Sequence, residues 1–78
     1  MSENSDESTV KITLANQIGY ERIAMACSAS FAEMFSFPKD RIEDLKTIVA
    51  EASMNAMQHG NKGRLDAKVI VALSCQDD

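Results

Sequence analysis

Glu51, Asn55 and His59 are the residues of this 78-residue chain whose types and spacing best suit chemistry. They follow one another at four-residue intervals inside residues 41–60, whose pattern predicts one long amphipathic helix. Each four-residue step turns a helix by about 400°, a net drift of about 40°, so the three side chains form one slanting row. This row is the best indication of function in the sequence.

The row combines a carboxylate, an amide and an imidazole at the edge of an apolar stripe. A carboxylate that is partly shielded from water can act as a general base, which is the role we expect for Glu51. The amide oxygen of Asn55 suits a hard cation such as Mg²⁺, which would bind substrate phosphates as well. His59, near the helix C-terminus, can carry a proton or anchor a hydrogen bond.

Each of these residues also has an ordinary structural explanation. A helical glutamate is often simply solvated, and an asparagine often caps a helix or bonds to a neighbouring one. A histidine near a helix C-terminus is often a cation stabilised by the helix dipole. A core helix whose polar row is accidental is therefore an open alternative, which expects Glu51 and Asn55 to face bulk solvent on a convex surface.

The elements around this helix predict an α+β fold in the order strand, helix, helix, strand. Residues 9–14 alternate between apolar and polar and predict a half-buried strand, whereas residues 67–73 predict a second, more buried strand. Residues 1–8 are acidic and polar, and we expect a disordered tail there. Two strands alone make a poor sheet, so we expect an incomplete sheet from a larger α/β sandwich with helices on one face.

The apolar periodicity predicts which helix faces are buried. On the helix predicted at residues 20–35, one side carries Tyr20, Ile23, Ala24, Cys27, Phe31 and Met34. On the helix at residues 41–60, the core stripe is Ile42, Leu45, Val49, Ala52 and Ala56, with a second apolar group of Ala50, Met54 and Met57. Gly19 suits a chain reversal, Pro38 suits the first turn of the second helix, and Gly60 suits a left-handed stop.

Composition narrows the range of partners. The net charge is −4, and the basic residues form no block, which argues against nucleic acid and against an anionic membrane surface. No apolar run is long enough to span a bilayer, and the acidic start does not resemble a secretory signal, so we expect a cytoplasmic protein. Cys27 and Cys75 lack a metal-binding spacing and predict two buried or half-buried thiols.

The run DLKTIVAEASMNAMQHGNK resembles the N box of the GHKL (Bergerat-fold) ATPases, and most closely that of the anti-sigma factor serine kinases of the RsbW and SpoIIAB type. The matching residues are Asp44, Leu45, Glu51, Ala52, Asn55, Ala56 and His59. The strand and helix before this run also resemble the N-terminus of that family. The resemblance covers residues 10–73, so residues 9–78 would be the N-terminal portion of a histidine-kinase-like ATPase domain.

The resemblance implies an ATP-binding serine/threonine-protein kinase that takes part in transcription regulation. Glu51 would be the catalytic base and Asn55 would hold Mg²⁺, while His59 and Lys62 would contact the nucleotide, Lys62 at its phosphates. The implied cofactors are ATP and Mg²⁺. The implied partners are a sigma factor, an anti-anti-sigma protein and a second copy of the chain.

The sequence departs from this family after the second predicted strand. The family continues into an Asp-x-Gly-x-Gly segment and a glycine-rich lid, whereas the glycines here are Gly19, Gly60 and Gly63. The chain thus resembles the first half of such a domain, as a fragment, a truncated product or a chain that another copy completes. A non-catalytic interaction or dimerisation module, working through its helices and strand edges, is the alternative function.

Overall fold

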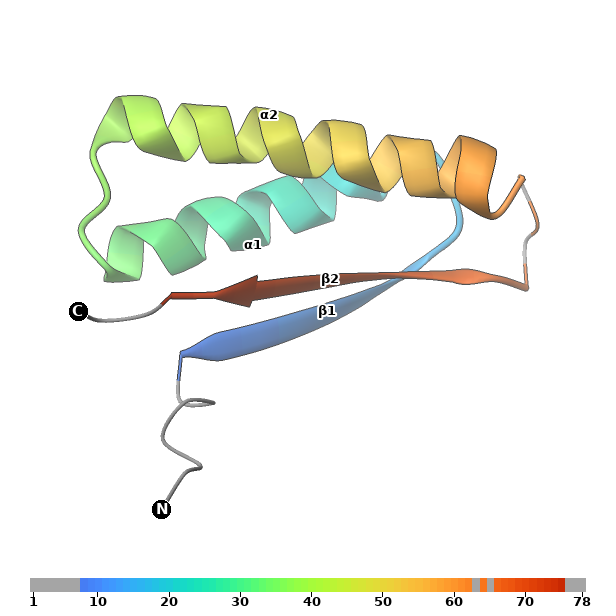
Figure 1. The fold of residues 1–78 in the computed structure, drawn as a ribbon, viewed down its shortest axis with the longest axis horizontal. Helices are drawn as coiled ribbons and strands as arrows, with labels where there is room; N and C mark the ends of the chain where they lie inside the picture. The colour runs from blue at the N-terminus through green and yellow to red at the C-terminus, as the bar shows by residue number, and fades with distance from the viewer. Residues whose placement is uncertain (1–7, 63, 65, 76–78) are drawn as a thin grey trace, which may run out of the picture.

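The computed structural model describes residues 8–62, 64 and 66–75. Its elements are strand β1 (Thr9–Ala15), helix α1 (Glu21–Met34), helix α2 (Lys39–Asn55), π-helix η2 (Ala56–Gly60) and strand β2 (Lys68–Ser74). Both helices lie over the same face of the sheet (Figure 1). The predicted α+β order of strand, helix, helix and strand is confirmed, and so is the incomplete sheet.

The sheet has two antiparallel strands, which pair from Thr9 with Ser74 through to Ala15 with Lys68. Alternation along each strand sends one set of side chains toward the helices. Leu14 of β1 is buried there, as are Val69 and Leu73 of β2. The second strand therefore contributes more to the core, as predicted, but its other face is open and Ile70 is 63% exposed.

Helices α1 and α2 form a hairpin whose contact surface consists largely of small residues. Ala24, Ser28 and Ala32 of α1 are buried, as are Ile42, Val49 and Ser53 of α2. The Ser28 hydroxyl donates to the Ala24 carbonyl at 2.7 Å, so its burial leaves no unmet donor. The core below combines Leu14, Ala24, Val49, Met57 and Val69.

The predicted core face of α1 is largely wrong, because Ala24 is buried and Phe31 half-buried while its other members are exposed. Ile23 is 49% exposed, Met34 is 80% exposed, and Cys27 is exposed rather than buried or half-buried. The buried residues of α1 lie about 100° around the helix from the stripe that hydrophobicity selects. The physical reason is that close contact with α2 selects small side chains, and the two strands do not cover the apolar stripe.

The predicted faces of α2 also shift. Ala52 was expected in the core and is exposed, whereas Ser53 is buried. Met57, assigned to a separate apolar group, is 2% exposed and belongs to the core. The stripe is rotated toward Ser53 and Met57 because α2 packs against α1 and the sheet together.

Several boundaries differ from expectation by small amounts. Pro38 is the N-cap of α2, with an extended ψ of 153°, rather than a residue of its first turn. Ser8, expected in the disordered tail, accepts a hydrogen bond from the Cys75 amide at 3.1 Å. The rest of that predicted tail, residues 1–7, lies outside the described residues.

The molecule is thin and extended. Its principal extents are 39 × 33 × 15 Å, and its radius of gyration is 13.5 Å. A compact domain of this length would have a radius of gyration of about 11.5 Å. The excess is what one helix layer on a two-stranded sheet produces, because each strand has neighbours on only one edge.

Candidate functional site

The row of Glu51, Asn55 and His59 lies on the solvent side of the α2–η2 rod. All three side chains are exposed, as is the neighbouring Ala52, and Ile48 one turn earlier is 62% exposed. The helix thus brings the three residues to one face, as the four-residue spacing requires. No other part of the described chain covers these three side chains. The alternative in which the polar row is accidental expects the same exposure.

The π-helix η2 changes how this row ends. The Asn61 amide donates to the Ala56 carbonyl at 2.7 Å, a hydrogen bond that spans five residues. A π turn rotates each residue less than an α turn does, so the drift from Asn55 to His59 is smaller than in an α-helix. His59 is therefore held closer to the line of Glu51 and Asn55. Such π turns occur often at functional sites, and no periodicity in the sequence predicts this one.

The left-handed residue after the long helix is Lys62 rather than Gly60. Gly60 lies inside η2 without a positive φ, so the predicted left-handed stop is wrong at this residue. Lys62 instead adopts the left-handed conformation, with φ of 52°, and its side chain is exposed. The chain reversal two residues after η2 therefore puts Lys62 beyond the C-terminal end of the row.

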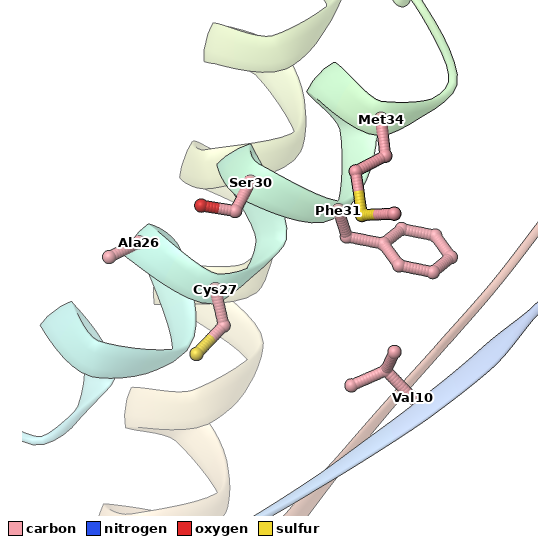
Figure 2. Close-up of a pocket in the computed structure, with 6 residues that line it drawn as sticks. All are labelled: Val10, Ala26, Cys27, Ser30, Phe31 and Met34. Carbon is pink, nitrogen blue, oxygen red and sulfur yellow. The ribbon is translucent and has the colours of Figure 1, made fainter.

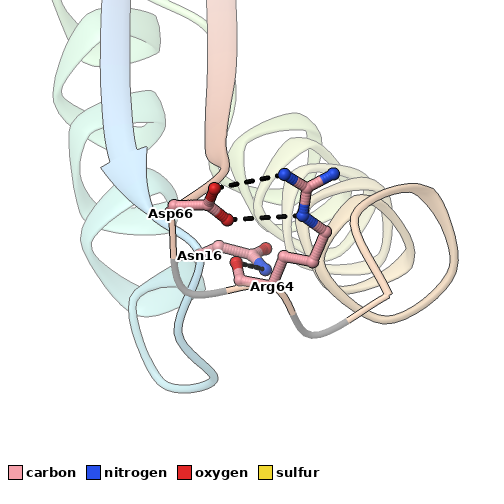
Figure 3. A network of polar contacts seen from close by, with 3 residues as sticks. All are labelled: Asn16, Arg64 and Asp66. Atoms are coloured by element: carbon pink, nitrogen blue, oxygen red, sulfur yellow. Dashed lines mark hydrogen bonds and ion pairs between the residues drawn. The ribbon is translucent and has the colours of Figure 1, made fainter.

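A polar clamp of Asn16, Asn61 and the Arg64 carbonyl holds this end of the molecule together. The Asn16 amide donates to the Arg64 carbonyl at 2.6 Å (Figure 3). The Asn61 amide donates to the Asn16 side-chain oxygen at 3.1 Å. Asn61 also donates to the Lys68 carbonyl at 3.3 Å. Asn16 is only 4% exposed, so the clamp joins the exit of β1, the end of η2 and the entry to β2.

This clamp is not among the sites that the sequence predicts. The available signal was an asparagine directly after a predicted strand, with a second one directly after the predicted end of the long helix. Asparagine side chains commonly bond to nearby backbone at such ends, but only the fold shows that these two meet.

An ion pair lies beside the clamp. The Arg64 guanidinium donates to both carboxylate oxygens of Asp66, at 3.3 and 3.1 Å, and both side chains are largely exposed. Such an exposed pair contributes little to stability.

The donor set on the row suits a cation shared with another ligand. Among the described residues, no group of three or more His, Cys, Asp or Glu side chains could hold a metal by itself. Asn55 and Glu51 together offer oxygen atoms one helical turn apart, and Mg²⁺ commonly takes only one or two protein ligands and completes its shell with phosphates and water. Two such oxygen atoms would leave most of the coordination shell of a cation to other ligands.

None of the helices in the described part of the chain is long and apolar enough to cross a membrane.

No protein-family profile matches the chain. The chain is similar to an anti-sigma F factor of Bacillus velezensis, with 33% identity over 57 residues, which is 73% of this chain. The chain spans 39% of the length of that curated relative. The chain is thus a distant relative of an anti-sigma F factor. It carries an exposed Glu–Asn–His row on the second helix of a strand–helix–helix–strand unit.

Proposed function

We propose that this chain is the part of an anti-sigma-type, ATP-binding serine kinase domain that carries the catalytic helix. The observation that supports this most is the exposed row on α2–η2, with Glu51 one turn from Asn55. The similarity to an anti-sigma F factor supports a role in the regulation of a sigma factor. The proposed role is to regulate a sigma factor by binding it and by phosphorylating a partner.

Each residue of the row has a distinct task in this proposal. Glu51, as general base, accepts the proton of the attacking hydroxyl of a partner serine, or of water. Asn55 holds Mg²⁺ through its amide oxygen, and His59 supports the nucleotide from the next turn. Lys62 brings a positive charge toward the phosphates from beyond the helix end. Bound Mg-ATP supplies the transferable phosphoryl group.

The proposed partners follow from the same role. A sigma factor is the protein regulated, an anti-anti-sigma protein is the phosphoryl acceptor, and a second copy of the chain completes a homodimer. Because the curated relative is longer than this chain, these activities belong to the proposal for the whole protein.

Substitutions on the row separate binding from transfer. We expect Asn55→Ala to reduce Mg-ATP affinity at least about tenfold, because the cation loses its protein ligand. Glu51→Gln should retain that affinity and lower phosphoryl transfer by about 10²- to 10⁴-fold, because it removes the base. Calorimetry measures the first effect, and labelled phosphate on an anti-anti-sigma protein measures the second.

The matched control for these variants is Glu43→Gln, which removes an exposed carboxylate two turns earlier on the same helix. It should change neither quantity. If Glu51→Gln lost binding and transfer together, the base assignment would be wrong.

The alternative function is a non-catalytic interaction module. It is favoured by the exposed apolar stripe of α1 and by the free sheet edges of the described strands. Light scattering with and without Mg-ATP distinguishes the two functions. A monomer at all concentrations that binds nucleotide at micromolar concentration would exclude the module, whereas self-association without nucleotide binding would favour it.

A further inference from the structure

Asn61 forms hydrogen bonds through both its backbone and its side chain. Its amide N–H donates to the Ala56 carbonyl at 2.7 Å, which closes η2, and its carbonyl accepts from the Arg64 amide at 3.0 Å. Its side chain donates to the Asn16 side-chain oxygen at 3.1 Å and to the Lys68 carbonyl at 3.3 Å. One asparagine therefore joins the end of η2 to the exit of β1 and to the start of β2.

The helix end that Asn61 holds has little stability of its own. π turns are rare, and the last carbonyls of any helix lack partners within it. Gly60, a poor helix former, is the last residue of η2. Lys62, directly after Asn61, has a left-handed φ of 52°, which costs free energy for a residue other than glycine and persists only where the surrounding structure requires it. We therefore expect this end to open unless its neighbours hold it.

His59 and Lys62, which contact the nucleotide in the proposed function, lie on either side of this asparagine. His59 is two residues before Asn61 and two residues after Met57, which is 2% exposed and anchors η2 in the core. Lys62 is the next residue after Asn61. Both side chains are exposed, so their positions depend mainly on the backbone that Asn61 holds.

The row is exposed, and an apolar groove of the described chain lies elsewhere, between α1 and β1. Figure 2 shows the Phe31 ring above Val10 in this groove, with the Met34 side chain beside the ring. The groove has a volume of about 370 Å³ and is lined by Val10, Ala26, Cys27, Ser30, Phe31 and Met34, none of which belongs to the row or to the clamp. Alignment of a nucleotide on the row therefore depends on how firmly the backbone of the row is held.

We propose that Asn16 and Asn61 are positioning residues for the nucleotide, which hold His59 and Lys62 in place through the end of η2. Asn16 is 4% exposed, and its amide donates to the Arg64 carbonyl at 2.6 Å, so it offers Asn61 a fixed acceptor. The two asparagines act without touching the nucleotide themselves. This inference rests on the proposed function, because a nucleotide on the row is what His59 and Lys62 would contact.

Substitution of either asparagine should free the end of η2 in the absence of nucleotide. We expect the backbone order parameters of His59 and Lys62 to fall from about 0.85 to below about 0.6 in Asn61→Ala and in Asn16→Ala, because each variant removes the bond between the two side chains. The order parameter of Val49, inside α2, should stay at about 0.85. Nitrogen-15 relaxation measures these values, and circular dichroism checks that each variant folds.

The same variants should weaken nucleotide binding. We expect calorimetry to give a Kd for Mg-ATP that is about three- to tenfold higher in Asn61→Ala and in Asn16→Ala, because only a fraction of the molecules then has both contacting side chains in place. The double variant should bind no more weakly than Asn16→Ala alone, since the two asparagines act as one unit.

A third background shows whether the clamp acts through its neighbours. In a chain that already carries His59→Ala and Lys62→Ala, the further change Asn61→Ala should raise the Kd less than about twofold, because the side chains that it positions are gone. A residue that contacted the nucleotide directly would still weaken binding there by its full factor, and that result would contradict a positioning role.

Ile42→Val is the control for a general loss of stability. Ile42 is 8% exposed and lies near the start of α2, at the other end from the clamp, so this substitution weakens the core without touching the clamp. Met34→Gln is the control for the groove, because it changes an 80% exposed side chain there. Both variants should keep the order parameters at the end of η2 and the Kd of the unmodified chain.

Two results would overturn the proposal directly. One is unchanged order parameters in both asparagine variants. The other is lower order parameters with an unchanged Kd, because the clamp would then hold the helix end without serving the nucleotide. If the unmodified chain bound no Mg-ATP, the proposed function would fail and the role toward the nucleotide with it. The order parameters, which need no nucleotide, would show in that case whether the clamp holds the helix end.

Discussion

At the residue scale, the buried amide of Asn16 contributes more to this structure than the exposed ion pairs among the described residues. Asn16 is almost fully buried, and its side chain both donates to Arg64 and accepts from Asn61. The ion pair of Lys46 with Glu43, at 3.4 Å, joins partly exposed side chains on one helix and contributes little. The end of the row that carries His59 is therefore held in place mainly by neutral hydrogen bonds.

Replacing Asn16 tests this clamp. We expect Asn16→Ala to lower the free energy of unfolding by about 1–3 kcal/mol, because it leaves buried partners without hydrogen bonds. Urea denaturation followed by circular dichroism measures the loss. The adjacent exposed residue gives the control, and Gln17→Ala should change stability by less than about 0.5 kcal/mol. Equal effects of the two substitutions would contradict a role for the clamp.

At the element scale, the α2–η2 rod has a buried side and an exposed side, and the exposed side carries the candidate row. Val49, Ser53 and Met57 set its packing, while Glu51 and Asn55 are left on the solvent side. The hydroxyl of Ser53 is buried without a hydrogen-bond partner among the described residues. The small size of Ser53, rather than its polarity, explains its place in the contact with α1.

Two glycines at element ends should respond oppositely to alanine. Gly19 has φ of 108°, which strains any other residue, so Gly19→Ala should destabilise the chain by about 1–3 kcal/mol. Gly60 is helical with open space around its Cα, so Gly60→Ala should stabilise it by about 0.5–1 kcal/mol. Thermal denaturation of the two variants side by side measures both signs. Destabilisation by Gly60→Ala would argue against the π-helix.

At the scale of the whole molecule, the small core and the open edges define the behaviour. Eight hydrophobic side chains of the described residues are buried, while large apolar residues on α1, α2 and β2 remain exposed. A layer 15 Å thick encloses little more, because the described part of the chain forms a two-stranded sheet. Association with another surface would therefore bury the apolar side chains that remain exposed.

The sequence by itself determined the order of the elements and the residues of the candidate row. Alternation predicts the strand at residues 9–14, and the β-branched content of residues 67–73 predicts the second strand. The four-residue spacing of Glu51, Asn55 and His59 predicts one shared helix face, because such periods are local properties of the backbone. Only the tertiary structure decided which faces are buried. Close packing of α1 on α2 selected Ser28 and Ser53 over larger apolar residues, and hydrophobic periodicity carries no information about that contact. The clamp of Asn16 with Asn61 likewise joins residues 45 positions apart, so only the fold brings them together.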